Sequence, residues 1–174
     1  MNKLSHRILV MGVSGSGKSH IGQQLAAELG ATFIDGDDHH SSANVAKMAS
    51  GTPLNDDDRR DWLATLADLF AAYKARDTTV VIACSGLKKR YRERLREGDP
   101  GLRVLYLQGS QMLLRERLET RAGHFFKGDS MLASQLADLE PPSSEEAVTV
   151  SIALSPSEII ERFTAALAPK THVH

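Results

Sequence analysis

The stretch from Gly12 to Ser19 constrains the fold of this chain more than any other part of the sequence. It reads GVSGSGKS and matches the pattern G-x-x-x-x-G-K-[ST] at every fixed position. The apolar run 8–11 precedes it as a buried strand would, and apolar residues at helical spacing follow from Ile21. A strand, glycine loop and helix in this order predict a phosphate-binding site, because inward-pointing backbone N–H groups and the helix N-terminus attract an anion. An ordinary glycine and serine turn is the alternative, and the agreement between the motif and its flanking elements argues against it.

Each position of this loop has an expected part in binding a triphosphate. Lys18 would reach the β- and γ-phosphates, and the hydroxyl of Ser19 would bind Mg²⁺. The glycines let the backbone turn so that its N–H groups face the phosphates. The predicted nucleotide-binding residues are therefore Gly12, Val13, Ser14, Gly15, Ser16, Gly17, Lys18 and Ser19.

The length and charge of the chain narrow the classes of protein to which it can belong. A chain of 174 residues suffices for one well-buried α/β domain, so we expect a single domain over 1–174. With 21 basic and 22 acidic residues it has no general attraction for nucleic acid or for an anionic membrane, and we expect neither as a partner. A single cysteine, Cys84, and the lack of a secretion signal or a membrane-length apolar run predict a cytoplasmic protein.

Five short apolar runs alternate with helical patterns along the chain. The runs cover about 8–11, 31–34, 79–83, 103–107 and 147–152, and the helical patterns cover about 21–29, 44–48, 53–73, 87–96, 113–121, 131–139 and 155–167. This alternation predicts a three-layer α/β fold, with a five-stranded parallel sheet between two layers of helices. The run at 79–83 ends in Cys84 and Ser85 rather than in an aspartate, which argues against motor and helicase ATPases. We assign the apolar stripe from Trp62 to Tyr73 to the core.

Two aspartates, Asp35 and Asp37, follow the second predicted strand at the sheet edge that also carries the phosphate loop. An extended chain would point both the same way, one toward Mg²⁺ and its waters and the other toward a phosphate acceptor. A solvated acidic turn is the alternative. The adjacent His39 and His40 are expected to face solvent or substrate rather than zinc, because no cysteine or spaced histidine completes a four-ligand site.

Basic residues gather in two later helical segments. Lys88 and Arg92 lie one turn apart in the segment 87–96, and we expect these two to face the cleft while most of the other charges there are solvated. Arg117 and Arg121 precede a glycine-bounded break at 123–128, after which another helix begins. The region over about 115–140 therefore predicts a mobile helical lid that closes over phosphates, with an ordinary helical hairpin as the alternative.

Several stretches beyond the phosphate loop make the chain resemble the gluconokinases, small P-loop kinases that are similar to shikimate kinase and nucleoside monophosphate kinases. The most specific are LNDDDR at 54–59 and GHFF at 123–126, and the others are DGD at 35–37, KMASG at 47–51, CS at 84–85, LKK at 87–89 and YR at 91–92. The chain departs from the family pattern at 41–43, at Gly86 and around 128–130. The resemblance implies ATP-dependent phosphorylation of D-gluconate at its 6-hydroxyl, with Mg²⁺ and in a homodimer.

Under this resemblance, the acceptor site is expected in an insertion over about 37–60 and in the helices that follow. Asp37 is the candidate for taking the proton of the acceptor hydroxyl and Asp35 for the water shell of Mg²⁺, and the opposite assignment stays open. Lys18, Arg117 and Arg121 would stabilise the transferring phosphoryl group. The substrate-binding candidates are Asp37, His40, Arg59, Lys88, Arg92 and His124, with Lys88, Arg92 or Arg59 holding the carboxylate of the sugar acid.

Two other kinds of function compete with this one. Another small-molecule kinase, acting on shikimate or a nucleoside monophosphate, would differ only in its acceptor pocket. A nucleotide-dependent switch or a nucleic-acid-dependent ATPase is disfavoured, because the sequence contains neither N-K-x-D nor D-x-x-G and its charge is balanced.

Overall fold

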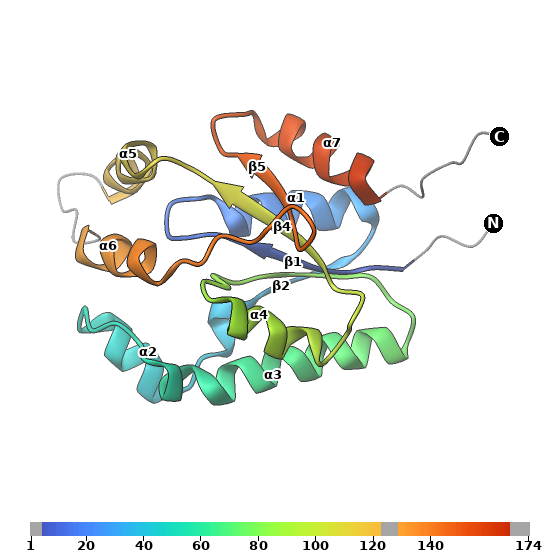
Figure 1. Ribbon diagram of the computed structural model, residues 1–174, viewed down its shortest axis with the longest axis horizontal. Coiled ribbons are helices and arrows are strands. Elements are labelled where there is room, and N and C mark those ends of the chain that lie inside the picture. Colours follow the sequence, from blue (N-terminus) through green and yellow to red (C-terminus); the bar gives the residue numbers. More distant parts are fainter. Residues whose placement is uncertain (1–4, 123–128, 168–174) are drawn as a thin grey trace.

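Five parallel strands form the centre of the protein in the computed structural model, which describes residues 5–122 and 129–167. The strands are β1 (Arg7–Met11), β2 (Thr32–Asp35), β3 (Val80–Ala83), β4 (Arg103–Gln108) and β5 (Val148–Ser151). Their order is β2-β3-β1-β4-β5, and Leu9 of β1 pairs with Ile82 on one side and Val104 on the other. Because all neighbours are parallel, the carboxyl ends of the strands meet at one edge of the sheet (Figure 1). The predicted five-stranded parallel sheet is confirmed.

Helices cover both faces of the sheet, since its central strands are apolar on both sides. Along β1, Ile8 and Val10 face one core, which α1 (Lys18–Leu29) and α7 (Pro156–Leu167) complete. Leu9 and Met11 face the other core, which is completed by α3 (Asp56–Ala75) and α4 (Lys89–Arg96). The side-chain period of two along a strand produces this division. Figure 1 shows the two helical layers on opposite sides of the sheet, which confirms the three-layer architecture.

Two of the helices, α3 and α7, begin at capping boxes. At α3, Asn55 Oδ1 accepts from the Asp58 N–H and Asp58 Oδ2 accepts from the Asn55 N–H, both at 2.8 Å, which closes a capping box. Ser155 and Glu158 make the corresponding pair of hydrogen bonds at the start of α7. The helix expected over 87–96 begins only at Lys89, because Lys88 has an extended backbone and is its N-cap.

Three further helices lie toward the carboxyl edge of the sheet (Figure 1), namely α2 (Ser42–Ala49), α5 (Gln111–Ala122) and α6 (Asp129–Asp138). A short element, η1 (Gly36–His39), precedes α2 in the chain. The 3₁₀ helix η1 begins directly after β2, because Asp35 Oδ1 accepts from the Asp37 N–H at 3.0 Å. The expectation of an extended chain through Asp35 and Asp37 is therefore wrong. Helices α5 and α6 flank the break at 123–128, which lies outside the described residues.

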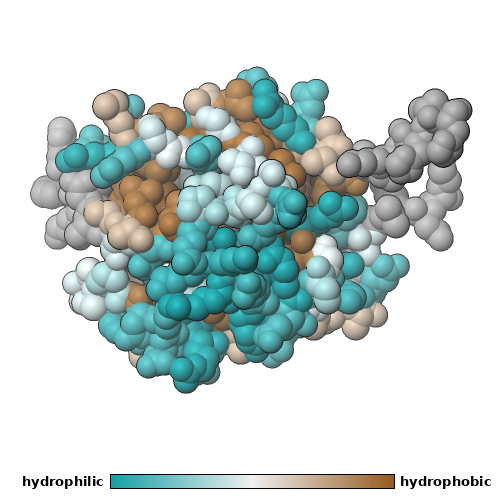
Figure 2. Space-filling view, in the orientation of Figure 1, coloured by the Kyte–Doolittle hydropathy of each residue, from teal (hydrophilic) through white to brown (hydrophobic). Residues whose placement is uncertain are grey.

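The charged helix α4 presents much of its charge to water. Lys89, Arg90 and Glu93 are exposed, and Figure 2 shows a hydrophilic surface over this part of the molecule. The expectation of a solvated face is confirmed for these residues. Within the described ranges, none of the helices combines the length and apolar character that a membrane crossing requires.

Candidate active site

The phosphate loop joins β1 to α1 at the carboxyl edge of the sheet. Gly15 and Gly17 have positive φ angles of 86° and 82°, a conformation that glycine adopts without strain. Gly12 has no room for a side chain, because a Cβ there would lie 2.5 Å from Ser16 Oγ and 3.1 Å from the Leu107 carbonyl oxygen. No described side chain caps the start of α1, so the N–H groups of its first turn are available to an anion.

Two further features of the loop fit a bound phosphate group. Ser16 Oγ is buried and has no hydrogen-bond partner among the described residues, a costly state for a hydroxyl unless a ligand supplies the partner. A Cβ built on Gly17 would meet nothing within 4 Å, so the space beside the N-terminus of α1 is open. The loop therefore combines unsatisfied polar groups with room for the anion that would satisfy them.

Ser19 and Asp35 form the polar pair expected beside a divalent cation. Ser19 Oγ donates to Asp35 Oδ2 at 3.2 Å, while Asp35 Oδ1 is held by the N–H of Asp37. Over the described ranges, no cluster of three or more His, Cys, Asp or Glu side chains could hold a metal ion. A cation at this pair would thus need additional oxygens from a nucleotide, which is the usual way in which kinases bind Mg²⁺.

A cavity of about 250 Å³ lies between the phosphate loop and α3. Its lining combines groups from six parts of the chain: Ser14 and Lys18; Asp37 and His40; Met48; Pro53, Leu54, Arg59 and Trp62; Ser85 and Leu87; Ser134 and Gln135. The cavity therefore brings together the phosphate loop, a carboxyl group and a guanidinium group around a space of small-molecule size.

The backbone next to Asp37 is held in place by α3 and β3. Trp62 Nε1 donates to the Gly36 carbonyl oxygen at 2.6 Å, and Gly36 lies so close to β3 that a Cβ would be 2.7 Å from the Ala83 carbonyl oxygen. Although much of Asp37 touches solvent, its carboxyl lines the cavity, and desolvation there raises its pKa against the opposing effect of Lys18. A carboxyl with a raised pKa is suited to accepting a proton near neutral pH.

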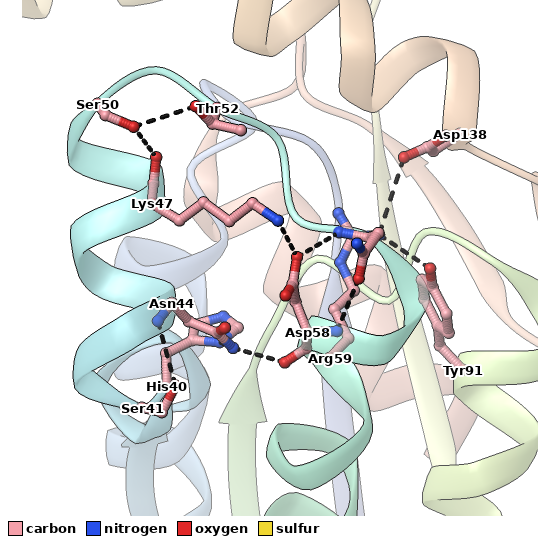
Figure 3. Close-up of polar contacts among 11 residues, drawn as sticks. His40, Ser41, Asn44, Lys47, Ser50, Thr52, Asp58, Arg59, Tyr91 and Asp138 are labelled. Atoms are coloured by element: carbon pink, nitrogen blue, oxygen red, sulfur yellow. Dashed lines mark hydrogen bonds and ion pairs between the residues drawn. The ribbon is translucent and has the colours of Figure 1, made fainter.

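Arg59 is the candidate carboxylate-binding cation that lies in the cavity. It is only 8% exposed, and its Nη1 donates to the Tyr91 hydroxyl at 2.8 Å and lies 3.8 Å from Asp138 Oδ2 (Figure 3). Lys88 lies in an adjoining hollow that Arg59 also lines, and its Nζ is 3.3 Å from Asp56 Oδ1. Arg59 is thus better placed than Lys88 to meet a ligand in the cavity.

Arg92 holds the segment between α6 and β5 and does not line the cavity. Its side chain is 1% exposed and donates to Glu146 Oε1 at 2.6 Å and to the carbonyl oxygens of Gly86, Leu87 and Glu140 at 2.7, 3.1 and 2.9 Å. The expectation that Arg92 faces the cleft and binds the substrate carboxylate is wrong, because all three guanidinium nitrogens donate to protein oxygens.

The predicted lid residues are described only in part. Arg117 is half-buried on α5 and donates to the Ile152 carbonyl oxygen at 2.5 Å, so it does not line the cavity in this conformation. The side chain of Arg121 and the whole of His124 lie outside the described residues. Closure of the lid over phosphates stays a prediction.

Several residues of the cavity were not recognised as site residues from the sequence, and two of them, Gln135 and Trp62, contact residues that were. Gln135 Oε1 accepts from the Ser14 N–H at 2.7 Å and so connects α6 to the phosphate loop. Trp62 was assigned to the core and is buried, but its ring also stacks on His40 with centroids 4.2 Å apart. Helical periodicity shows that a side chain points inward and cannot distinguish a core from a cavity. Gln135 had no local signal, since its partner lies 121 positions away.

Comparisons with known proteins agree with this geometry. A family model described as "AAA domain" matches residues 8–142. The thermoresistant gluconokinase of Escherichia coli (strain K12) is 48% identical over 141 residues, covering 81% of this chain and 80% of that protein. The probable gluconokinase of Mus musculus is 45% identical over 170 residues, covering 87% and 92%. The crystal structure of a gluconokinase from Sinorhizobium meliloti 1021 matches with a TM-score of 0.86 at 43% identity, covering 95% of this chain and 93% of that one. The chain belongs to the gluconokinase family of P-loop kinases.

Proposed function

We propose that this protein transfers the γ-phosphoryl group of ATP to the 6-hydroxyl of D-gluconate, giving 6-phospho-D-gluconate and ADP. The observation that carries the proposal is the cavity shared by Lys18 of the phosphate loop, the carboxyl of Asp37 and the guanidinium of Arg59. An acceptor with a hydroxyl at one end and a carboxylate at the other matches these groups. The relatives named gluconokinases support this choice of acid over shikimate or a nucleoside monophosphate.

The loop residues 12–19 would bind the phosphates of ATP through backbone N–H groups, with the ammonium of Lys18 on the β- and γ-phosphates. The Ser16 hydroxyl would gain the partner that it lacks among the described residues. Ser19 and Asp35 would hold Mg²⁺, partly through water, and the ion would neutralise charge on the transferring phosphoryl group. Their contact at 3.2 Å supports Asp35 rather than Asp37 on the metal side.

Asp37 would orient the acceptor hydroxyl and take its proton. A base is most effective when its pKa approaches the working pH, so the raised pKa of Asp37 supports this role. On α3, Arg59 would pair with the carboxylate of gluconate, and His40 would contact another oxygen of the sugar chain. The cavity would thereby fix both ends of the acceptor relative to the phosphate loop, which is how positioning accelerates phosphoryl transfer.

We also propose that 37–60 form the acceptor-binding insertion and 115–140 the lid of a single domain over 1–174. Arg117 would have to release the Ile152 carbonyl oxygen before reaching the phosphates, and Arg121 and His124 would act from the same segment. The protein would work as a homodimer in the cytoplasm. The buried free thiol of Cys84 supports a reducing compartment, and sedimentation equilibrium tests the dimer.

The function is tested by ADP formation in a coupled assay with ATP, Mg²⁺ and a panel of gluconate, glucose, shikimate and a nucleoside monophosphate. Gluconate is expected to give the highest kcat/KM, and ³¹P and ¹³C NMR of the product should place the phosphate on carbon 6. Lys18→Ala supplies the blank for contaminating kinases. A preference for shikimate or a nucleotide would overturn the proposal.

A further inference from the structure

Asn44 is a buried polar residue on a helix that is otherwise largely exposed. It is 6% exposed, whereas Ala43, Val45 and Ala46 beside it on α2 are exposed. Its backbone N–H donates to Ser41 Oγ at 3.1 Å, which caps the start of α2. Figure 3 shows its side chain directed toward His40 and the first turn of α3. A buried side-chain amide needs hydrogen-bond acceptors for its N–H groups, so the contacts of Asn44 indicate which neighbouring atoms are acceptors.

The orientation of the Asn44 amide is fixed by the backbone of α3. Asn44 Nδ2 lies 2.6 Å from the Asp58 carbonyl oxygen, which can only accept a hydrogen bond. The atom facing this oxygen must therefore be the amide nitrogen, because the amide oxygen would be repelled there. Asp58 itself is held by Lys47, whose Nζ is 2.6 Å from its carboxylate, and by the capping box with Asn55. The acceptor that orients Asn44 is thus part of a fixed helix start.

This orientation determines the protonation of His40. The same Asn44 Nδ2 lies 3.3 Å from His40 Nδ1. The amide nitrogen carries two hydrogens and accepts none, so one hydrogen serves the Asp58 carbonyl oxygen and the other serves Nδ1. Nδ1 can accept only without a proton of its own. A neutral imidazole with a bare Nδ1 carries its proton on Nε2.

The surroundings of the His40 ring favour this neutral form. The ring stacks on Trp62 at an interplanar angle of 18°, and burial, assisted by the charge of Arg59, lowers the pKa of His40 to about 4. Besides Arg59, the charged residues that line the cavity with His40 are Lys18 and Asp37. Asp58 of α3 lies on the other side of Asn44, which contacts both Asp58 and His40. At neutral pH the ring is therefore uncharged, and its single N–H is available on Nε2.

We propose that Asn44 is a positioning residue that holds His40 as the Nε2–H tautomer, so that His40 donates a hydrogen bond to an oxygen of the polyhydroxy acid. The acceptor class rests on the proposed function. In this arrangement His40 selects for an oxygen at one position of the acceptor, while Asp37 alone serves as the proton-accepting group. An acceptor without that oxygen would leave a desolvated N–H unpaired and would be disfavoured.

The tautomer can be read directly by long-range ¹H–¹⁵N NMR of protein labelled at its 7 histidines, with His40→Gln used to assign the signal. At pH 7.5 and without substrate, wild-type His40 should show a bare Nδ1 and a protonated Nε2. Asn44→Ala should give a mixture of both tautomers, and Asn44→Asp, which can only accept at this position, should shift His40 toward protonated Nδ1. Ser41→Ala is the matched control, because it removes the cap of α2 and leaves the amide contact with Nδ1.

The kinetic consequence separates positioning from loss of structure. Asn44→Ala should raise KM for gluconate about two- to tenfold, the range for one hydrogen bond, with KM for ATP unchanged. A protonated Nδ1 in the wild type, or an unchanged tautomer in both Asn44 variants, would overturn the proposal. The NMR measurement needs no substrate, so it determines the tautomer of His40 whether or not gluconate is the acceptor. Failure of the protein to phosphorylate gluconate would refute the proposed function and leave the tautomer result standing.

Discussion

Replacing Arg59 by Met tests which cation binds the carboxylate of the acceptor. Methionine retains much of the length and apolar surface of the side chain and removes the charge. The Tyr91 hydroxyl, which accepts from Arg59, also donates to Asp56, so it keeps a partner in the variant. We therefore expect the fold to survive and the loss to appear in recognition of the acid.

The magnitude follows from the burial of the guanidinium. At 8% exposure Arg59 is poorly screened by water, so its contact with a carboxylate should be worth about 1.5–3 kcal/mol, the range for hydrogen bonds to charged groups. Since 1.4 kcal/mol corresponds to a factor of ten, kcat/KM for gluconate should fall about 10- to 150-fold. Glucose lacks the carboxylate, so its already low kcat/KM should change by less than about threefold, within the range of an uncharged contact.

The assay measures kcat/KM for gluconate and for glucose with the coupled ADP reaction, in wild type, Arg59→Met and Arg60→Met. Arg60 is the control, because it is the next residue of α3, its side chain is 76% exposed, and it pairs with Asp57 on the surface. Thermal unfolding checks that both variants are folded. An equal fractional loss of kcat/KM for the two acceptors, which leaves the preference for gluconate unchanged, would refute the carboxylate contact and make Arg59 a structural residue.

Three more variants test the other parts of the site. Lys18→Ala should lower kcat about 10²-fold or more with unchanged thermal stability, because the ammonium serves phosphate rather than the core, and near-normal turnover would contradict this. Asp37→Asn should lower kcat about 10²–10⁴-fold. Because the pKa of Asp37 is raised in the folded state, this residue stabilises the fold below its ordinary pKa, and the stabilisation is lost as the pH rises through the raised value. The melting temperature of Asp37→Asn should therefore exceed that of the wild type at pH 7.5, and the difference should shrink toward acid pH. Gln135→Leu should raise KM for gluconate about two- to tenfold by freeing α6 from the Ser14 N–H, whereas a lower KM for ATP would show that Gln135 competes with phosphate.

The strands, the phosphate loop and the helices could be predicted, apart from the exact ends of the helices, because each depends on residues close in sequence. The apolar run 8–11, the glycine loop after it and the helical spacing from Ile21 are examples, and they form the expected strand, loop and helix. The choice among Arg59, Lys88 and Arg92 could not be made in this way. Arg92 is withdrawn from the cleft by oxygens 48 and 54 positions away, and no local pattern indicates those partners.

The turn after β2 shows a different limit. Spacing alone suggested an extended chain through Asp35 and Asp37, but the carboxylate of Asp35 accepts from the Asp37 N–H and starts η1. An aspartate side chain that accepts a hydrogen bond from a nearby backbone N–H can end a strand and begin a turn. The sequence alone does not show whether such a residue continues the strand or begins the turn. Asp37 still lines the cavity and Asp35 still contacts Ser19 at the start of α1, while η1 is held against β3 through Gly36.

The central position of β1 in the sheet has a consequence for redesign. The phosphate loop leaves the middle strand, so the segment between β2 and β3 supplies Asp37, His40 and Arg59 from one side, while α5 and α6 approach after β4 on the other. Segments that determine the acceptor could therefore be exchanged between enzymes as one block, from the end of β2 to the end of α3, without cutting the strand that carries the loop. Such a graft would keep nucleotide binding and change the molecule that receives the phosphoryl group, provided that the contacts of Arg59 with Asp138 and with Tyr91 are rebuilt across the boundary.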